Sequence, residues 1–194
     1  NFSTIPETSI FQDNTSRNNG QFIFGRIGFD YFATNRTTLS VGAVKVRGEF
    51  KPYDFIATST DSLYQSGTTT SYTERVTTGS RVFNGTGLSF GLKQLFPKDG
   101  QELTADVNYF GGRNNSNSLY HTDLFAAKGG VATDYIEQQL LSNGRNQFVT
   151  LQTDYVQPIK GKLKVETGLR AQLRKTESNI DNYFYNDATG DFEL

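Results

Sequence analysis

Hydrophobic and polar residues alternate along much of the chain. In residues 162–174 the odd positions are apolar except for one threonine, and the even positions carry five charges. Such alternation predicts a β-strand with one apolar and one polar face, because successive side chains in a strand point to opposite sides of the sheet. Shorter runs of the same kind occur at residues 23–31, 88–93, 102–109 and 149–155. The pattern therefore predicts an all-β protein.

Turn-forming residues divide these segments. Asn, Pro, Asp and Gly gather at residues 34–37, 97–100 and 158–161, where we expect short turns. Polar stretches near residues 58–70, 111–118 and 128–133 are expected to be long loops, and residues 1–19 and 186–194 to be loops or cut ends. The remaining region, 20–185, is expected to form an antiparallel meander of six long strands, at about residues 21–33, 38–57, 71–96, 101–125, 134–157 and 162–185.

The predicted connections are short at one end of the strands and long at the other. Strands of soluble sandwiches usually have about 5–6 residues, and these are several times longer. Long alternating strands with short turns on one side and long loops on the other are typical of outer-membrane β-barrels. Aromatic residues near the short turns suit the girdle of such a barrel: Tyr31, Phe32, Phe96 and Tyr155. The pattern predicts part of a large transmembrane β-barrel in the bacterial outer membrane.

Closure of the barrel requires more strands than the six predicted here. Single-chain bacterial barrels have at least about eight strands, and an open edge in lipid leaves backbone groups unpaired. The chain starts at Asn1 and contains no methionine. We therefore expect this sequence to be a portion of a longer chain.

The composition excludes several classes of protein. The mean hydropathy of −0.53 is low, but this does not argue against a barrel, in which only every second residue faces lipid. The net charge of −1 provides no basic excess for binding nucleic acid. The absence of cysteine excludes disulfides, thiolate metal centres and cysteine nucleophiles. No catalytic arrangement is found, so we expect neither enzymatic activity nor a cofactor.

The polar faces of the predicted strands supply the candidates for ligand binding. In a barrel these side chains would face the lumen, and in a soluble sheet they would form a solvated face. The candidates are Arg26, Asp30, Lys93, Asp106, Asp154, Arg170 and Arg174. His121 is the only histidine and has Asp123 nearby, but this is too few ligands for a metal site. We expect His121 to be a solvated side chain and no residue to bind a metal.

Three phrases of the sequence resemble a known family. They are FDYFATNRTTLSVGA (29–43), GLSFGLKQLFPKDGQELTADVNY (87–109) and LQTDYVQPIKGKLKVETGLRAQLRKTESNID (151–181). Their order and spacing are similar to the barrels of TonB-dependent-receptor-like proteins of Bacteroidota, and most closely to the outer-membrane β-barrel family. The resemblance covers about residues 20–182 and corresponds to a middle portion of the barrel.

The resemblance implies a barrel of about 22 strands that encloses an N-terminal plug. It also implies uptake powered through TonB and ligand capture by the extracellular loops. The partners implied are the remainder of the barrel and its plug, outer-membrane lipid, TonB acting through that plug, and a surface lipoprotein. No functional residue of the family maps onto this sequence. The alternative interpretation is a soluble or surface-anchored β-sandwich that binds carbohydrate or serves in adhesion.

Overall fold

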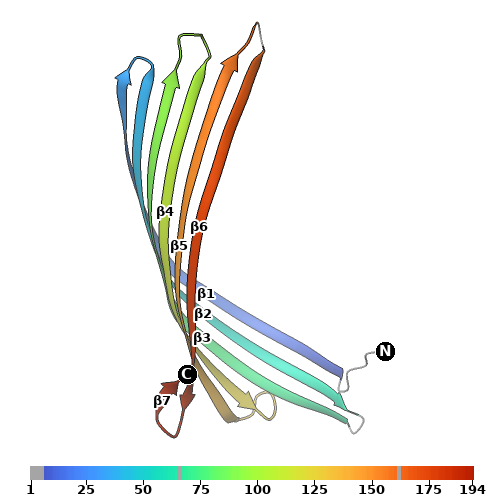
Figure 1. Ribbon diagram of the computed structural model, residues 1–194. Coiled ribbons are helices and arrows are strands. Elements are labelled where there is room, and N and C mark those ends of the chain that lie inside the picture. The colour runs from blue at the N-terminus through green and yellow to red at the C-terminus, as the bar shows by residue number, and fades with distance from the viewer. Residues whose placement is uncertain (1–6, 65–66, 161–162) are drawn as a thin grey trace.

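The computed structural model describes residues 7–64, 67–160 and 163–194, which form a single seven-stranded antiparallel sheet. The strands lie side by side in the order of the sequence (Figure 1). Six are long, with 23 to 29 residues: β1 (Glu7–Thr34), β2 (Thr37–Tyr64), β3 (Gly67–Leu95), β4 (Glu102–Phe125), β5 (Ala132–Pro158) and β6 (Lys164–Asn186). A short seventh strand, β7 (Asp191–Glu193), pairs with the end of β6. The predicted all-β meander is confirmed.

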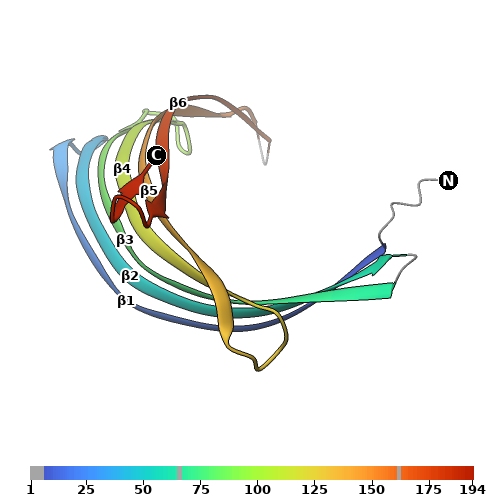
Figure 2. The ribbon, with the colours of Figure 1, turned by 90° about the horizontal axis from the view of Figure 1, so that it is seen from below.

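The sheet is strongly curved and remains open, as the view in Figure 2 shows. Within the described part of the chain, strand β1 pairs with β2 alone, and β6 pairs on its outer side only with the three residues of β7. There is no second sheet among the described residues, so the β-sandwich alternative is wrong. In lipid, each unpaired backbone group of an open edge costs several kcal/mol, so further strands must close this sheet within a membrane.

The three connections that were predicted to be short lie together at one end of the sheet, but the connections at the other end, residues 65–66 and 126–131, are no longer than these, so the predicted contrast between short turns and long loops is wrong. The three predicted connections comprise residues 35–36, 96–101 and 159–163, which confirms the turns predicted at 34–37 and 97–100. The turn at 158–161 falls in the same connection, but its last residue lies outside the described residues. In the β3–β4 turn, the amide of Gln101 donates to the carbonyl of Lys98 over 3.0 Å, and Gly100 has a φ of 74°. Glycine suits this left-handed conformation because it has no side chain.

Two of the three predicted long loops are wrong. Residues 58–64 and 67–70 continue β2 and β3, with 65–66 outside the described residues, and residues 111–118 lie inside β4. The third predicted loop does contain a connection, because β4 and β5 are joined by residues 126–131, but this connection is only as long as the β3–β4 turn at residues 96–101. These stretches resemble loops because both of their faces are polar, but residues 58–63 and 111–118 pair with a strand on each side and residues 67–70 pair with β2.

The expected end segments are corrected in the same way. Residues 7–19 belong to β1, where they pair with β2, and residues 186–194 contain the turn that leads to β7. Spanning a bilayer takes about 9–11 tilted residues, so each of the six long strands extends well beyond the thickness of a membrane. Among the described residues, no helix has the length and apolarity needed to cross a bilayer.

Candidate functional site: two faces of the sheet

The register of the strands arranges the side chains in rows that cross the sheet. Residues paired directly across antiparallel strands point to the same side. Three successive rows are apolar except for Thr153, and we call them the apolar face. They consist of Ile27, Phe29, Tyr31, Leu39, Val41, Ala43, Leu88, Phe90, Leu92, Ala105, Val107, Tyr109, Val149, Leu151, Thr153, Leu169, Ala171 and Leu173.

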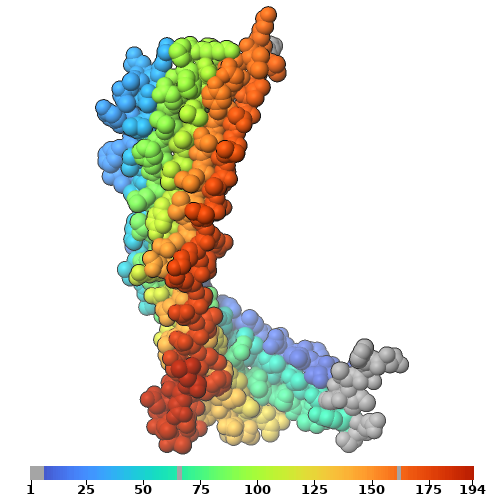
Figure 3. All heavy atoms as spheres, in the orientation of Figure 1, coloured from blue at the N-terminus to red at the C-terminus, as the bar shows by residue number. Residues whose placement is uncertain are grey.

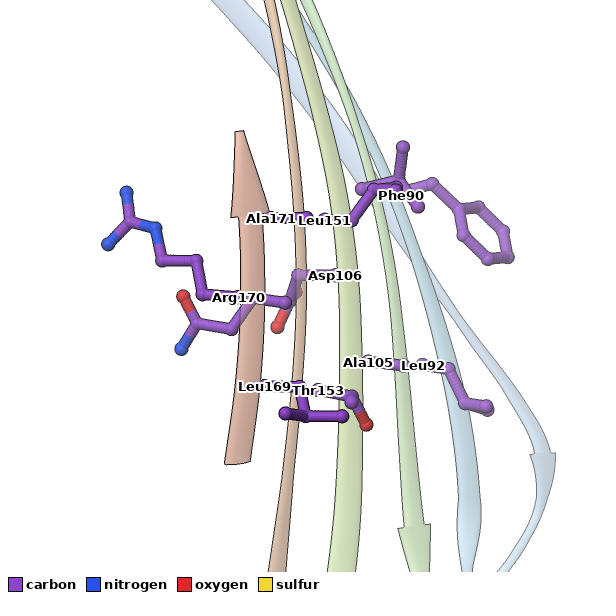
Figure 4. Close-up of a pocket in the computed structure, with 11 residues that line it drawn as sticks. Phe90, Leu92, Ala105, Asp106, Leu151, Thr153, Leu169, Arg170 and Ala171 are labelled. Carbon is purple, nitrogen blue, oxygen red and sulfur yellow. The ribbon is translucent and has the colours of Figure 1, made fainter. Parts of the chain in front are cut away.

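Large side chains of the apolar face are exposed. Phe29 is 71% exposed and Leu169 is 78% exposed, and even Phe90 on the central strand β3 is 47% exposed. A shallow groove of about 560 Å³ lies where the small residues Ala105 and Ala171 stand among larger ones. Figure 4 shows Phe90 and Leu92 on one side of the sheet and Arg170 on the other. An apolar surface that crosses six strands requires an apolar environment.

At the same level, the opposite face is made of polar or small residues, and we call it the polar face. Its two central rows are Asp30, Ser40, Gly91, Asp106, Gln152 and Arg170, and Gly28, Gly42, Ser89, Asn108, Thr150 and Gln172. The Ser40 hydroxyl donates to Asp30 Oδ1 over 2.7 Å, and Gln152 Nε2 donates to Asp154 Oδ2 over 2.8 Å. Each strand thus presents opposite chemistry to its two sides.

All seven candidate residues predicted from the sequence lie on the polar face. Asp30, Asp106 and Arg170 share one row, Lys93 and Asp154 share the next, and Arg26 and Arg174 stand at the two ends of a third. They do not form one compact site, because a row crosses the whole sheet. Lys93 instead pairs with Glu102, with 3.0 Å between Nζ and Oε2.

The polar face also carries a phenylalanine cluster that the sequence analysis missed. It lies beyond the two central rows, on the side away from the short turns, and consists of Phe22, Phe24, Phe50, Phe83, Phe110 and Phe148. The rings of Phe110 and Phe148 stack with 5.3 Å between their centroids. Phe24, Phe110 and Phe148 line a pocket of about 380 Å³ together with Arg26.

Glycines make room for this cluster. Gly87 is paired directly with Phe110, and Gly48 with Phe83. A Cβ atom added to Gly85 would meet the Phe110 ring at 2.6 Å, so a larger residue there requires the ring to shift. The signal in the sequence was the set of strand glycines, but only the register reveals that phenylalanine rings cover them.

The expected aromatic girdle is found only in part. Tyr31 and Tyr155 lie on the same side as the apolar face near the short turns, while Phe32 lies on the polar side. Phe96 packs edge-on against Tyr155, with 6.1 Å between ring centroids, and Gln101 Nε2 donates to the Tyr155 hydroxyl over 2.6 Å. At the opposite boundary of the apolar face, Gln147 Nε2 donates to the Tyr109 hydroxyl over 3.1 Å.

His121 is held by two carboxylates, not merely solvated as expected. Its Nδ1 lies 2.8 Å from Glu137 Oε1 and its Nε2 lies 3.2 Å from Asp123 Oδ1. The ring stacks on Tyr135 at 5.6 Å. The hydrogen bond to Glu137 raises the pKa of His121, and Asp123 adds to this effect while burial opposes it. The described residues contain no group of three or more potential ligands placed to hold a metal ion.

Comparison with known proteins identifies the barrel type. The family model described as "Outer membrane protein beta-barrel family" matches residues 94–194. No curated protein matches the chain. The outer membrane transporter YddB from Escherichia coli has 8% identity and a TM-score of 0.18 over 90% of this chain and 35% of its own.

Two further solved structures are similarly distant. Pseudomonas aeruginosa OpdL has 9% identity and a TM-score of 0.15, with 92% of this chain and 96% of its own covered. The membrane pore complex of pneumolysin has 9% identity and a TM-score of 0.18, with 95% and 33% covered. The chain thus spans about a third of YddB and of the pneumolysin chain. At these TM-scores the structural matches support no argument, and the assignment depends on the family model.

Proposed function

Because the chain belongs to the outer membrane protein beta-barrel family, we propose that it forms part of the wall of a TonB-dependent-receptor-like transporter of Bacteroidota. The polar face lines the lumen, and the apolar face contacts lipid. The strand segments beyond the membrane contact ligand on the outer side. The proposal is carried by one observation: the two faces differ in chemistry at the same level on all six long strands.

Energetics favour this orientation over its reverse. An arginine or lysine on the lipid face near the middle of the bilayer costs about 2–4 kcal/mol. The reverse orientation would place Arg170 there, together with the carboxylates of Asp30 and Asp106. The residues from Leu103 to Tyr109 on β4 extend about 20 Å along the strand, so this segment fits within the apolar band of ~25 Å in outer-membrane barrels.

The open edges of β1 and β6 support a larger assembly. We propose that the remainder of the same barrel closes them and that a plug occupies the lumen next to the polar face. TonB then acts through the plug, and a surface lipoprotein assists capture on the outer side. Within this lumen, the phenylalanine cluster and Arg26 offer stacking surfaces and one positive charge to a passing ligand.

Cysteine accessibility tests the orientation directly, because the sequence contains no native cysteine. Gln152→Cys on the polar face and the adjacent Leu151→Cys on the apolar face are made in the full-length protein, with any other cysteine replaced. A small charged thiol reagent that reacts in water should modify Gln152→Cys in intact membranes and modify Leu151→Cys only after unfolding. Equal modification of both variants, or the reverse pattern, would overturn the proposed orientation.

The coupling to TonB requires a separate test. The full-length protein in detergent should bind the purified periplasmic domain of TonB, and a version that lacks the region N-terminal to the barrel should not. Failure of the full-length protein to bind would refute the TonB-dependent role and leave the orientation of the wall unaffected.

A further inference from the structure

The side of the sheet that carries the apolar face becomes basic just beyond it. Moving away from the short turns, the next two rows on this side contain five basic residues: Lys45, Arg47, Arg113, Arg145 and Lys175. They stand on β2, β4, β5 and β6, directly beyond Tyr109 and Leu173 at the boundary of the apolar face. Two acidic residues accompany them on this side, Glu49 and Glu177.

A pocket of about 460 Å³ lies among these basic residues, and we call it the basic pocket. It is lined by Lys45, Arg113 and Arg145, together with Tyr109 and Gln147. A Cβ atom added to Gly111 would lie 2.5 Å from the Tyr109 hydroxyl, so this glycine lets the tyrosine lie along the strand toward the pocket. Tyr109 therefore connects the apolar face with the basic pocket.

The positive charge of the basic pocket is only partly balanced. Lys175 pairs with Glu177 over 2.6 Å, and Arg47 approaches Glu49 at 4.0 Å. Lys45 donates to the neutral hydroxyl of Thr86 over 2.9 Å. Within the described part of the chain, no carboxylate lies within ion-pair distance of Arg113 or Arg145. These two exposed arginines are paired directly across β4 and β5, and Arg145 is paired on its other side with Glu177, whose carboxylate contacts Lys175. Like charges directly opposite each other destabilise a sheet, so an anion that contacts both guanidinium groups stabilises this pair.

We infer that the basic pocket binds the phosphate group of a phosphorylated lipid headgroup in the outer leaflet. Guanidinium groups bind phosphate through two parallel hydrogen bonds, so Arg113 and Arg145 suit this ligand. The pocket faces outward at the boundary of the apolar face, where headgroups begin, and not toward the lumen. The groove at Ala105 and Ala171 lies on the same side, where an acyl chain of that lipid lies. This inference rests on the orientation in the proposed function.

The test compares a lipid with its dephosphorylated form. The full-length protein in detergent is titrated with phosphatidic acid, with diacylglycerol of the same acyl chains, and with inorganic phosphate, and bound molecules are counted by native mass spectrometry. The variant Arg113→Gln/Arg145→Gln is compared with Arg75→Gln/Arg81→Gln, which removes two positive charges from the polar side of β3.

The inference predicts that phosphatidic acid binds preferentially and that Arg113→Gln/Arg145→Gln weakens this binding by at least about tenfold. The control variant should bind as the unmodified protein does. The inference would be overturned if diacylglycerol or free phosphate bound as strongly as phosphatidic acid, or if the double variant bound phosphatidic acid as strongly as the unmodified protein. Should the double variant fail to assemble, each single variant is measured by the same criteria. The labelling of residues 151 and 152 reports separately whether the underlying orientation is correct.

Discussion

At the scale of single residues, His121 shows how pairing across strands creates chemistry that is distant in sequence. Glu137 lies on the next strand, and its carboxylate holds one ring nitrogen while Asp123 on the same strand approaches the other. Tyr135 stacks on the ring and donates its hydroxyl to Asp187 over 2.5 Å, which raises the pKa of Tyr135 to about 12. The contact between His121 and Glu137 therefore links β4 to β5 in the part of the sheet beyond the membrane.

This arrangement predicts a pH dependence. The pKa of His121 is raised in the folded protein, so its contribution to stability is fully present below the unfolded pKa of about 6.5. The contribution is lost as the pH rises through the higher folded pKa. Glu137→Gln should lower the pKa of His121 toward its ordinary value, because it removes the main partner. NMR titration measures the pKa of His121, and the variant His121→Gln identifies its signal. An unchanged pKa in Glu137→Gln would show that Glu137 does not raise the pKa of His121.

Gly87 offers a second test at this scale. A Cβ atom at this position would meet Val44 at 2.6 Å and Phe110 at 3.2 Å. We expect Gly87→Val to destabilise the folded barrel by about 1–3 kcal/mol, because the cluster has to shift to accept the new side chain. Gly25→Val is the matched control, since nothing lies within 4 Å of its Cβ position. Urea unfolding in detergent micelles should show a lower midpoint for Gly87→Val alone, and equal midpoints for both would refute the packing.

At the scale of elements, each long strand has a membrane segment with two unlike faces and a further segment in which polar and apolar residues are not separated in this way. On β6 the membrane segment contains Val165, Leu169 and Leu173 on one side and Arg170 on the other. The exposure of Leu169 and Leu173, 78% and 68%, leaves them free to contact lipid. The extension from residue 175 onward carries Lys175, Glu177 and mostly polar residues.

Charge placed on the lipid side of β6 should prevent assembly. Val165→Arg and Leu169→Arg together should raise the free energy of the assembled barrel by several kcal/mol, because one charge near the middle of the bilayer costs about 2–4 kcal/mol. The control Gln172→Arg adds a charge on the opposite side of the same strand and should be tolerated. Assembly is measured by heat-modifiable migration of the full-length protein from outer membranes. If the double variant assembles as well as the control, β6 does not face lipid as described.

The sequence predicted the membrane segments of the strands well but not their extensions. Alternation is visible only where the two sides meet different solvents, as at Leu103 to Tyr109. From residue 111 to 118 both sides of the strand carry mostly polar or small residues, so the pattern disappears while the strand continues. Alternation also placed Arg170 and Asp106 on one side correctly. It could not reveal the pairing of Phe110 with Gly87 or of His121 with Glu137, because these depend on the register between strands.

At the scale of the whole molecule, the sheet is a curved wall with two open edges (Figures 1 and 3). Few side chains are buried, and Tyr72 is the one buried hydrophobic residue among those described. A wall without a core of its own is stable only when lipid covers one side and further strands complete the backbone pairing. The low mean hydropathy is thus an average over two faces and the polar extensions, and it conceals the apolar face.

The central claim is that one side of this wall faces lipid and the other faces water. Spin labels placed singly at residues 143–155 of β5, in the full-length protein reconstituted in bilayers, measure it most directly through their accessibility to oxygen and to a water-soluble nickel chelate. The account predicts high oxygen accessibility at 149, 151 and 153, chelate accessibility at 150, 152 and 154, and loss of this alternation at residues 143–147. Uniform accessibility to the chelate through residues 148–155, or oxygen maxima at the even positions, would contradict it.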